Sequence, residues 1–169
     1  MIVRRFVDPD LEQVAALADA AWVEIRRMSR RALGEAISDV LRPGGDAGSK
    51  GREVRAQLAA GSGWEAFVAE EEGRIVGFVT FSISGGIGLI GNNAACRTSG
   101  IRGIGQAMYK KVLETLRERG VRVVRVTTGL DDAHAPARRA YERAGFSRHL
   151  DSRTYYLDLD EMTQEGRNE

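Results

Sequence analysis

The sequence is poor in the residues that build disulfides, metal centres and membrane spans. Its 169 residues include 1 cysteine, 2 histidines and 3 prolines. The single cysteine, Cys96, excludes an internal disulfide and a CxxC motif. His134 and His149 lie too far apart for a usual zinc site, so we expect no metal. No apolar run approaches the ~18 residues that a membrane-spanning helix needs, so no membrane association is expected.

An excess of charge of one sign is also missing. The 25 Lys and Arg residues against 24 Asp and Glu residues give a formal net charge of +1. This balance gives no support to bulk attraction for nucleic acid. The first residues lack the apolar segment of a signal peptide, so a cytoplasmic location is expected. The length predicts a single domain, residues 1–160, followed by a polar C-terminal tail, residues 161–169.

Glycine, by contrast, is abundant. The chain has 20 glycines, about 12% of its residues where roughly 7% is usual. The excess follows neither a collagen period nor a low-complexity pattern. It therefore indicates backbone that bends sharply or comes close to a ligand. Seven of the glycines fall within residues 85–105.

Hydrophobic periodicity predicts an α+β domain with helices on the faces of a β-rich centre. Alternating or continuous apolar runs predict strands at Ile2–Phe6, Trp64–Ala69, Arg74–Ile83, Ile87–Cys96, Val121–Val126 and Thr154–Leu159. Helical spacing predicts helices at Leu11–Ile25, Leu33–Leu41, Arg52–Ala60, Ile104–Leu116 and Pro136–Ala144. The turn-rich segment Pro43–Gly51 is expected to be a loop.

Two glycine-rich segments compete as ligand-binding loops. Gly86–Gly91 is a literal GxGxxG. A dinucleotide fingerprint requires a helix directly after it and an acidic residue roughly 20 positions further on. Here Asn92 begins a loop-like segment and Lys111 stands at the acidic position. We therefore interpret this segment as a hairpin followed by an irregular strand.

The second segment, Ser99–Met108, leads from a strand through a turn directly into an amphipathic helix. Free N–H groups and the positive end of the dipole at such a helix start bind anions, most often phosphate. Gly103 and Gly105 carry no side chain that would hold a pyrophosphate away from the backbone. Arg102 adds a positive charge at the rim. This segment therefore predicts a phosphate site.

Residues Ala94–Ala107 followed by His134–Phe146 resemble the GCN5-related N-acetyltransferase (GNAT) superfamily. Gly103-Ile104-Gly105 matches the glycine half of its acetyl-CoA motif, Arg/Gln-x-x-Gly-x-Gly/Ala, although Gly100 stands at the leading Arg/Gln. The later segment resembles the family's Asn-x-x-Ala-x-x-x-Tyr-x-x-x-Gly-Phe, with His134 in place of Asn. The resemblance implies a GNAT-like domain with a central mixed, mostly antiparallel sheet that splays between its fourth and fifth strands.

The resemblance also implies a reaction, the direct transfer of an acetyl group from acetyl-CoA to an amine in a ternary complex. We expect a small-molecule amine, with a protein N-terminus or lysine as alternatives, and leave a homodimer open. A backbone N–H near Asn93 or Ala94 is expected to polarise the thioester carbonyl, and Tyr141 is the expected general acid. The residues implied in cofactor binding are Ala94, Ala95, Cys96, Arg102, Gly103, Ile104, Gly105, Gln106, His134 and Ala137.

The sequence leaves the general base, the acceptor contacts and a second function open. The general base is unassigned among Glu24, Asp131 and His134, because the fourth strand offers only neutral Asn92 and Asn93. The basic run 26–31 gives the hypothesis that Arg27 and Arg30 recognise an acidic group on the acceptor. The second hypothesis for the function is a non-catalytic acyl-CoA-binding sensor or regulatory module.

Overall fold

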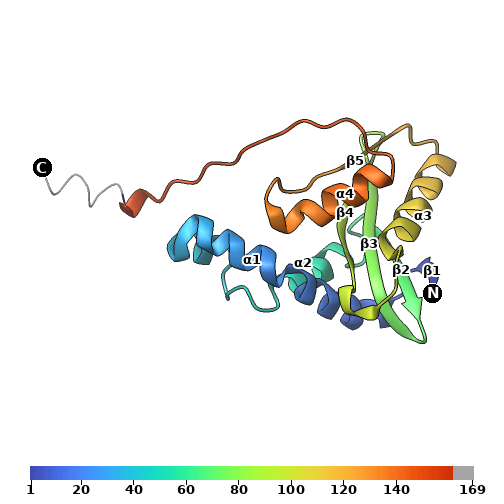
Figure 1. Cartoon of the computed structure of the whole chain (residues 1–169), viewed down its shortest axis with the longest axis horizontal. Coiled ribbons are helices and arrows are strands. Elements are labelled where there is room, and N and C mark those ends of the chain that lie inside the picture. The colour runs from blue at the N-terminus through green and yellow to red at the C-terminus, as the bar shows by residue number, and fades with distance from the viewer. Residues whose placement is uncertain (162–169) are drawn as a thin grey trace, which may run out of the picture.

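A five-stranded open sheet forms the centre of the computed structural model, which describes residues 1–161 (Figure 1). The strands lie side by side in chain order: β1 (Ile2–Arg5), β2 (Glu65–Glu71), β3 (Arg74–Ser84), β4 (Ile87–Ala95) and β5 (Val123–Val126). Neighbours from β1 to β4 are antiparallel, whereas β4 and β5 are parallel. The structure thus confirms the predicted mixed, mostly antiparallel sheet.

Helices cover both faces of this sheet. The first pair, α1 (Leu11–Leu41) and α2 (Ser49–Gln57), packs on one face, and α3 (Ile104–Glu118) and α4 (Ala135–Arg143) pack on the other. Successive residues of a strand point to opposite faces. Val68 and Phe78 accordingly lie in the core under α1, while Phe67 and Val79 lie in the core under α3. No helix within residues 1–161 is long and apolar enough to span a bilayer.

The two helical patterns predicted before residue 42 both lie within α1. Gly34 has φ +76° and ψ 173°, which is not a helical conformation, so α1 consists of two helical segments joined across a kink at this residue. Arg30 donates to Asp46 and to Asp39, both at 2.8 Å, and so ties the end of α1 to the turn before α2. The helix α2 begins at Ser49, three residues earlier than predicted.

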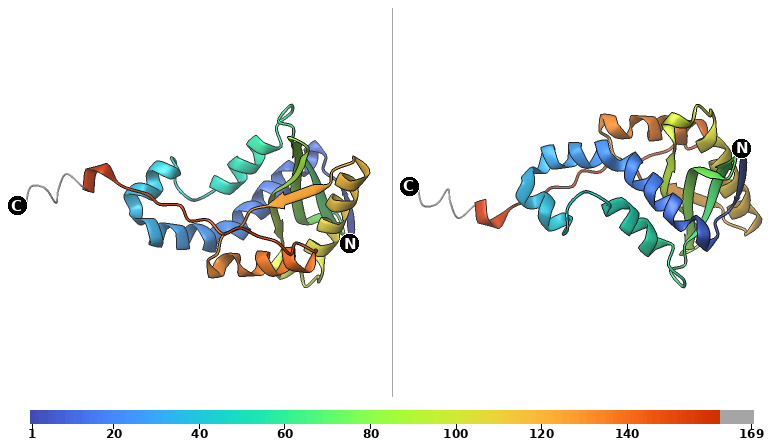
Figure 2. Two further views of the ribbon diagram at one scale, coloured as in Figure 1. Left: turned by 90° about the horizontal axis from the view of Figure 1, so that it is seen from above. Right: turned by 90° about the horizontal axis from the view of Figure 1, so that it is seen from below.

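The predicted final strand, Thr154–Leu159, is wrong. Residues 147–158 have no regular secondary structure and run away from the sheet, past the far end of α1 (Figures 1 and 2). The segment has the apolar and aromatic residues that favour a strand, but a strand needs a neighbour for its backbone hydrogen bonds. The boundary at residue 160 stays a prediction, and most of the expected tail, 162–169, lies outside the described residues.

The glycines of the GxGxxG segment serve turns and packing. Gly86 has φ +77° in the turn between β3 and β4. A Cβ atom at Gly91 would lie 2.5 Å from Cζ3 of Trp64 and 2.6 Å from Oγ1 of Thr80. The segment is followed by more strand rather than by a helix. These contacts favour the interpretation as a hairpin and an irregular strand.

Replacing Gly91 by alanine is expected to lower the free energy of unfolding by about 1–3 kcal/mol, the usual cost of overpacking. The matched control is Gly105→Ala. A Cβ atom there meets only Cε2 of Tyr109, at 3.6 Å, and alanine favours a helix by up to about 1 kcal/mol over glycine. Urea unfolding of both variants measures the difference. Equal stability of the two variants would contradict the packing described for Gly91.

Candidate functional site

The strands β4 and β5 separate after a short stretch of pairing. Their register runs from Ile87–Val123 to Ile90–Val126, and β4 then continues alone on this side through residues 91–95. The N–H of Cys96 donates to the carbonyl of Val76 on β3, at 2.8 Å. Alternate residues of a strand point their backbone groups the same way. The N–H groups of Asn93 and Ala95 therefore face the open side of β4.

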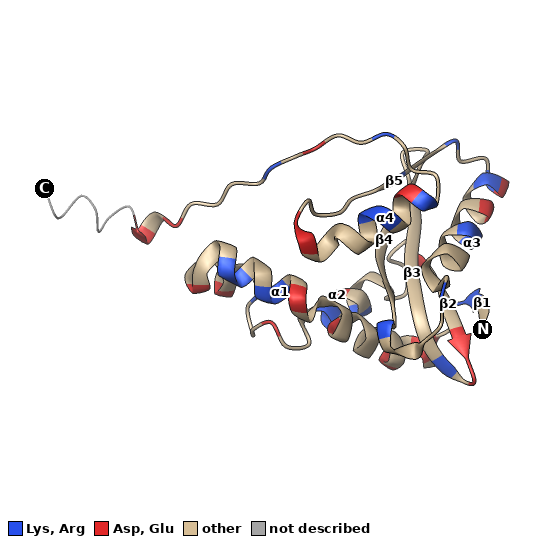
Figure 3. Ribbon diagram, viewed as in Figure 1, with Lys and Arg blue, Asp and Glu red and all other residues tan. Residues whose placement is uncertain are grey.

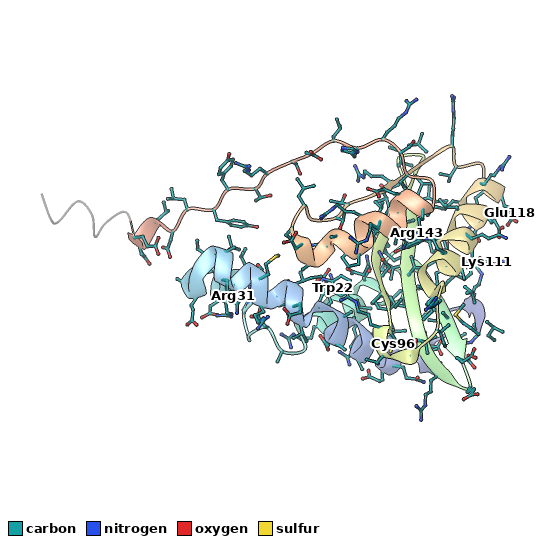
Figure 4. All side chains as sticks on the ribbon, viewed as in Figure 1. Trp22, Arg31, Cys96, Lys111, Glu118 and Arg143 are labelled. Carbon is teal, nitrogen blue, oxygen red and sulfur yellow. The ribbon has the colours of Figure 1, made fainter. Side chains whose placement is uncertain are left out.

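The three predicted cofactor residues at the end of β4, Ala94, Ala95 and Cys96, differ in the direction of their backbone groups. Ala94 shares the direction of Cys96, so its N–H faces β3, and its side chain packs in the core under α1. Ala95 packs on the α3 side and directs its backbone to the open edge. The Cys96 thiol lies 3.3 Å from Oγ1 of Thr98, and this hydrogen bond lowers its pKa (Figure 4 shows its position). Of the three residues, Ala95 is the one whose backbone is placed for a ligand at this edge.

The start of α3 has the free backbone donors and the open space that the predicted anion site requires. Gly103 precedes the helix with φ +79°, and a Cβ atom there would meet nothing within 4 Å. The first backbone bond of the helix runs from the N–H of Ala107 to the carbonyl of Gly103. The N–H groups of residues 104–106 have no helical acceptor, and no side chain caps them. The open space and free donors fit the pyrophosphate of acetyl-CoA.

The remaining predicted residues around α3 have mixed roles. Arg102 is exposed beside the helix start, where its charge is free to move. The side chain of Gln106 donates to the carbonyl of Ala140 at 2.8 Å and thereby joins α3 to α4. Ala137 packs against the core on the α3 side. Gln106 thus offers a ligand its backbone N–H, while its side chain holds the two helices together.

Tyr141 reaches the open half of β4 through Asn93. The Asn93 amide lies 2.9 Å from the carbonyl of Gly91, an acceptor only, so the atom there is Nδ2. Its second proton points to the hydroxyl of Tyr141, at 3.0 Å, and its Oδ1 accepts from the hydroxyl of Tyr109, at 2.8 Å. The Tyr141 hydroxyl therefore accepts a bond from Asn93. Its own proton has a long contact with Asn93 Oδ1, at 3.4 Å, and the hydroxyl also interacts with that of Tyr109.

Both phenols stay protonated well above neutral pH. Burial raises the pKa of Tyr141, against the opposing effect of its hydrogen bonds with Asn93 and Tyr109. Burial also raises the pKa of Tyr109, and the neighbouring Tyr141 raises it further. The two rings pack with centroids 5.4 Å apart. The protonated hydroxyl of Tyr141 therefore lies beside the open edge of β4.

His134 lies at the start of α4 and is held by Asp131. The ring nitrogen Nδ1 of His134 lies 2.6 Å from Oδ2 of Asp131, and the backbone N–H of His134 donates to Oδ1 of the same carboxylate at 3.1 Å. Burial raises the pKa of Asp131, but the bonds to His134 outweigh it and the net shift is downward. Arg138 donates to the carbonyls of Gly129 and Asp131 and fixes the loop. His134 thus occupies the N-cap position of α4, but its side chain makes no capping bond and its ring is held by Asp131.

A second polar cluster lies on the opposite face of β4, under α1 and α2. We call it the Glu53 cluster; it comprises Trp22, Arg26, Lys50, Glu53 and Asn92. The Glu53 carboxylate accepts from Lys50 at 2.7 Å and from Asn92 at 3.3 Å, and pairs with Arg26 at 3.5 Å. Lys50 is buried, and its ammonium lies 4.5 Å from the ring centroid of Trp22 (Figure 4 shows Trp22 on α1). Burial lowers the pKa of Lys50, against the effect of Glu53.

The arginines of the basic run are largely engaged by acidic neighbours. Residues of both charge signs lie along α1 (Figure 3). Arg27 pairs with Glu24 at 2.9 Å, and Arg30 pairs with Asp39 and Asp46. Recognition of an acidic acceptor group by Arg27 and Arg30 stays a hypothesis. It would compete with these ion pairs.

Comparison with known proteins agrees with this geometry. Residues 35–146, more than half of the chain, match the model of the acetyltransferase (GNAT) family. The chain belongs to the GNAT family. No curated protein sequence matches it.

Solved structures with the GNAT fold resemble it at low identity. A GNAT-family protein from Desulfovibrio desulfuricans is 22% identical, with TM-score 0.62 over 88% of this chain and 86% of that one. An acetyltransferase from Brucella melitensis in complex with acetyl-CoA is 22% identical, with TM-score 0.59 over 87% and 82%. The aminoglycoside N-acetyltransferase AAC(6')-Iy, bound to a bisubstrate analogue, is 15% identical, with TM-score 0.61 over 94% and 98%.

Sequence analysis missed Tyr109 and the Glu53 cluster. Tyr109 falls on the apolar stripe of α3, where an aromatic residue predicts packing and its hydroxyl gives no further signal. Glu53 lies in α2, whose residues are mostly polar, as in a helix on the protein surface. Only the crossing of α1, α2 and β4 brings Lys50, Glu53 and Asn92 together.

Gly103→Ala is expected to weaken CoA binding, because it adds a methyl group in the open space at the start of α3. We expect the Kd to rise about tenfold, or about 1.4 kcal/mol, in isothermal titration calorimetry. The control is Gly120→Ala at the other end of the same helix, where φ is +78° and the space is equally open. Both variants carry a similar strain of about 1–2 kcal/mol. Equal CoA affinity in the two variants would contradict an anion site at the start of α3.

Proposed function

We propose that this protein transfers an acetyl group from acetyl-CoA to the amine of a small molecule. The observation that carries the proposal is the lone stretch of β4, residues 91–95, with the Tyr141 hydroxyl beside it. The anion site at the start of α3 supports it from the cofactor side. Acetyl-CoA supplies the activated thioester, and the chain supplies orientation, a carbonyl-polarising donor and a proton donor.

Two backbone segments would hold the co-substrate. The N–H groups at the start of α3, residues 104–106, would bind the pyrophosphate, and Arg102 would add charge at the rim. The open edge of β4 would pair with the amide-containing arm as an added strand does. The N–H of Asn93 would polarise the thioester carbonyl, because it is fixed by the strand and faces the open side.

Tyr141 would support the leaving thiolate. Its hydroxyl accepts from Asn93 and so keeps its proton for a second partner. A free thiol has a pKa of about 8.5 and an ordinary phenol one of about 10, and burial raises that of Tyr141 further. Full proton transfer to the thiolate is therefore uphill. The phenol would act first as a hydrogen-bond donor as the sulfur gains charge. Tyr109 and Asn93 would be positioning residues.

The Glu53 cluster would meet the acceptor. It lies on the face of β4 opposite Tyr141, so a nucleophile and a leaving group would approach the strand from different sides. The Glu53 carboxylate is about half exposed, while its partner Lys50 is buried. Because Lys50 and Arg26 already balance its charge, this partly exposed carboxylate would act on the amine as a hydrogen-bond acceptor. This proposal adds an acceptor contact and leaves the base unassigned.

Tyr141→Phe is expected to lower kcat by about 100-fold, the lower range for loss of an acid–base group, with the KM for acetyl-CoA nearly unchanged. The deficit should widen as pH rises above about 8.5, because solvent then protonates the thiolate less well while the raised pKa keeps Tyr141 protonated. Thiol release across pH 6–10 measures it. Tyr109→Phe is the control, with a smaller loss and no change in the profile. A wild-type profile for Tyr141→Phe would exclude Tyr141 from this role.

Glu53→Gln should raise the KM for the amine about tenfold, or about 1.4 kcal/mol, without changing the KM for acetyl-CoA, since the neutral amide is a weaker hydrogen-bond acceptor for the amine than the carboxylate. The matched control is Glu12→Gln. Like Glu53, Glu12 pairs with an arginine, in this case Arg55 at 2.7 Å, but it lies outside the site. An equal effect of both changes, or none, would place the acceptor elsewhere.

The function itself is tested by thiol release from acetyl-CoA with a panel of polyamines, amino sugars, aminoglycosides and lysine peptides. Aminoglycosides enter the panel because AAC(6')-Iy shares the fold. Turnover on a small amine supports the proposal. Tight CoA binding without turnover on any amine would favour the sensor instead.

A further inference from the structure

Arg26 is the arginine of the basic run that reaches the Glu53 cluster. It stands one turn after Trp22 on α1, so the two side chains lie on the same face of the helix. A guanidinium has five N–H donors. Within residues 1–161, only Nη2 of Arg26 has an acceptor, Glu53 Oε2 at 3.5 Å, and the buried Nε–H has none. The side chain is 21% exposed, so a ligand can contact donors that the protein leaves unused.

The other arginines of the run are placed differently. Arg27 and Arg30 are held in ion pairs with acidic neighbours of α1 and of the turn before α2. Arg31 is exposed and lies farther from the sheet than Trp22 does (Figure 4). Arg26 is therefore better placed than Arg27 or Arg30 to recognise an acidic group on the acceptor.

The Glu53 cluster holds more positive than negative charge. Lys50 and Arg26 each carry one positive charge, and Glu53 carries the only negative charge of the cluster. Burial lowers the pKa of Lys50, against the effect of Glu53, and the charge of Arg26 lowers it further. Asp19, earlier on α1, accepts from the N–H of Gly51 at 2.7 Å. An anionic group beside Arg26 would therefore balance a charge that the cluster leaves uncompensated.

The two carboxylate oxygens of Glu53 differ in what they bond. Oε1 accepts from Lys50 and from Asn92, whereas among the described residues Oε2 has only the long contact with Arg26. Oε2 can thus accept from an amine directly beside a guanidinium that can bind a carboxylate. The two groups lie 3.5 Å apart, so an amine and a carboxylate joined by a single carbon atom would reach both.

We infer that the acceptor is an α-amino acid, with its carboxylate on Arg26 and its amine on Oε2 of Glu53. The inference rests on the proposed acetyl transfer and names the chemical class of its acceptor. Arginine binds a carboxylate through two parallel hydrogen bonds, a geometry that lysine does not offer. The neutral amine would bond the acetyl carbon as the C–S bond breaks, so the products are an N-acetyl amino acid and the CoA thiol. Arg26 would determine specificity.

Matched pairs of acceptors test the role of Arg26. Each standard amino acid is compared in the thiol-release assay with its amino alcohol, in which a hydroxymethyl group replaces the carboxylate. At least one amino acid should have a kcat/KM about 10- to 100-fold above that of its alcohol, the range of a charged hydrogen bond. Arg26→Gln should remove this preference by lowering kcat/KM for the acid alone. The control, Arg31→Gln, removes an exposed arginine of the same run and should keep the preference.

A second variant, Arg26→Lys, keeps the charge without the paired donors and should restore part of the preference. Equal kcat/KM for acids and alcohols in the wild-type protein, or a preference that persists in Arg26→Gln, would overturn the inference and leave the acetyl transfer intact.

Binding separates the two proposals if no acceptor releases thiol. That result would contradict the acetyl transfer, but an amino acid should still bind the CoA complex of the wild-type protein in isothermal titration calorimetry. Its Kd should rise about tenfold in Arg26→Gln, while the affinity for CoA and the circular dichroism spectrum stay unchanged. An absence of binding for every amino acid, or equal binding to Arg26→Gln, would overturn the inference.

Discussion

The loss of pairing between β4 and β5 after Ile90 and Val126 is the constraint on which the site depends. A sheet normally pairs its backbone groups throughout, and a strand that runs on alone leaves a row of donors and acceptors free. Here that row belongs to residues 91–95, in the middle of the domain. The chain leaves β4 toward the start of α3, where the anion site is predicted, and Tyr141 of α4 reaches the same strand through Asn93 (Figure 1).

Two adjacent asparagines organise the two sides of this strand. Asn93 points to the α3 and α4 side, where Gly91, Tyr109 and Tyr141 use its whole amide group. Asn92 points to the other side and bonds Gln57 and Glu53. One strand thus separates a protonated phenol from a carboxylate. A reaction that needs a proton on the leaving group and an attraction for an incoming amine fits such a division, and this fit underlies the proposed acetyl transfer.

Much of the fold follows from local patterns, and the departures have physical causes. The four predicted strands from β2 to β5 agree with the structure to within a few residues, and the apolar runs of β2 and β3 are largely buried in the sheet. The start of α3 was predictable because Gly103 combines a turn with a helix entry. The strand predicted at Thr154–Leu159 does not form. A local hydrophobic pattern can favour a strand, but it does not show whether a neighbouring strand is available to pair with it. The Glu53 cluster escaped for a similar reason, as its members meet only through tertiary packing.

The central claim is that acetyl-CoA binds along the open edge of β4 and at the start of α3. A ¹H–¹⁵N NMR titration of the protein with CoA tests it most directly. The account predicts the largest shifts, together with slowed amide exchange, at Asn93, Ala95 and residues 104–106, whose N–H groups face the open side or lack a helical acceptor. The amides of β1 and β2 should be unaffected. Saturable CoA binding that leaves Asn93 and Ala95 unchanged would contradict the account.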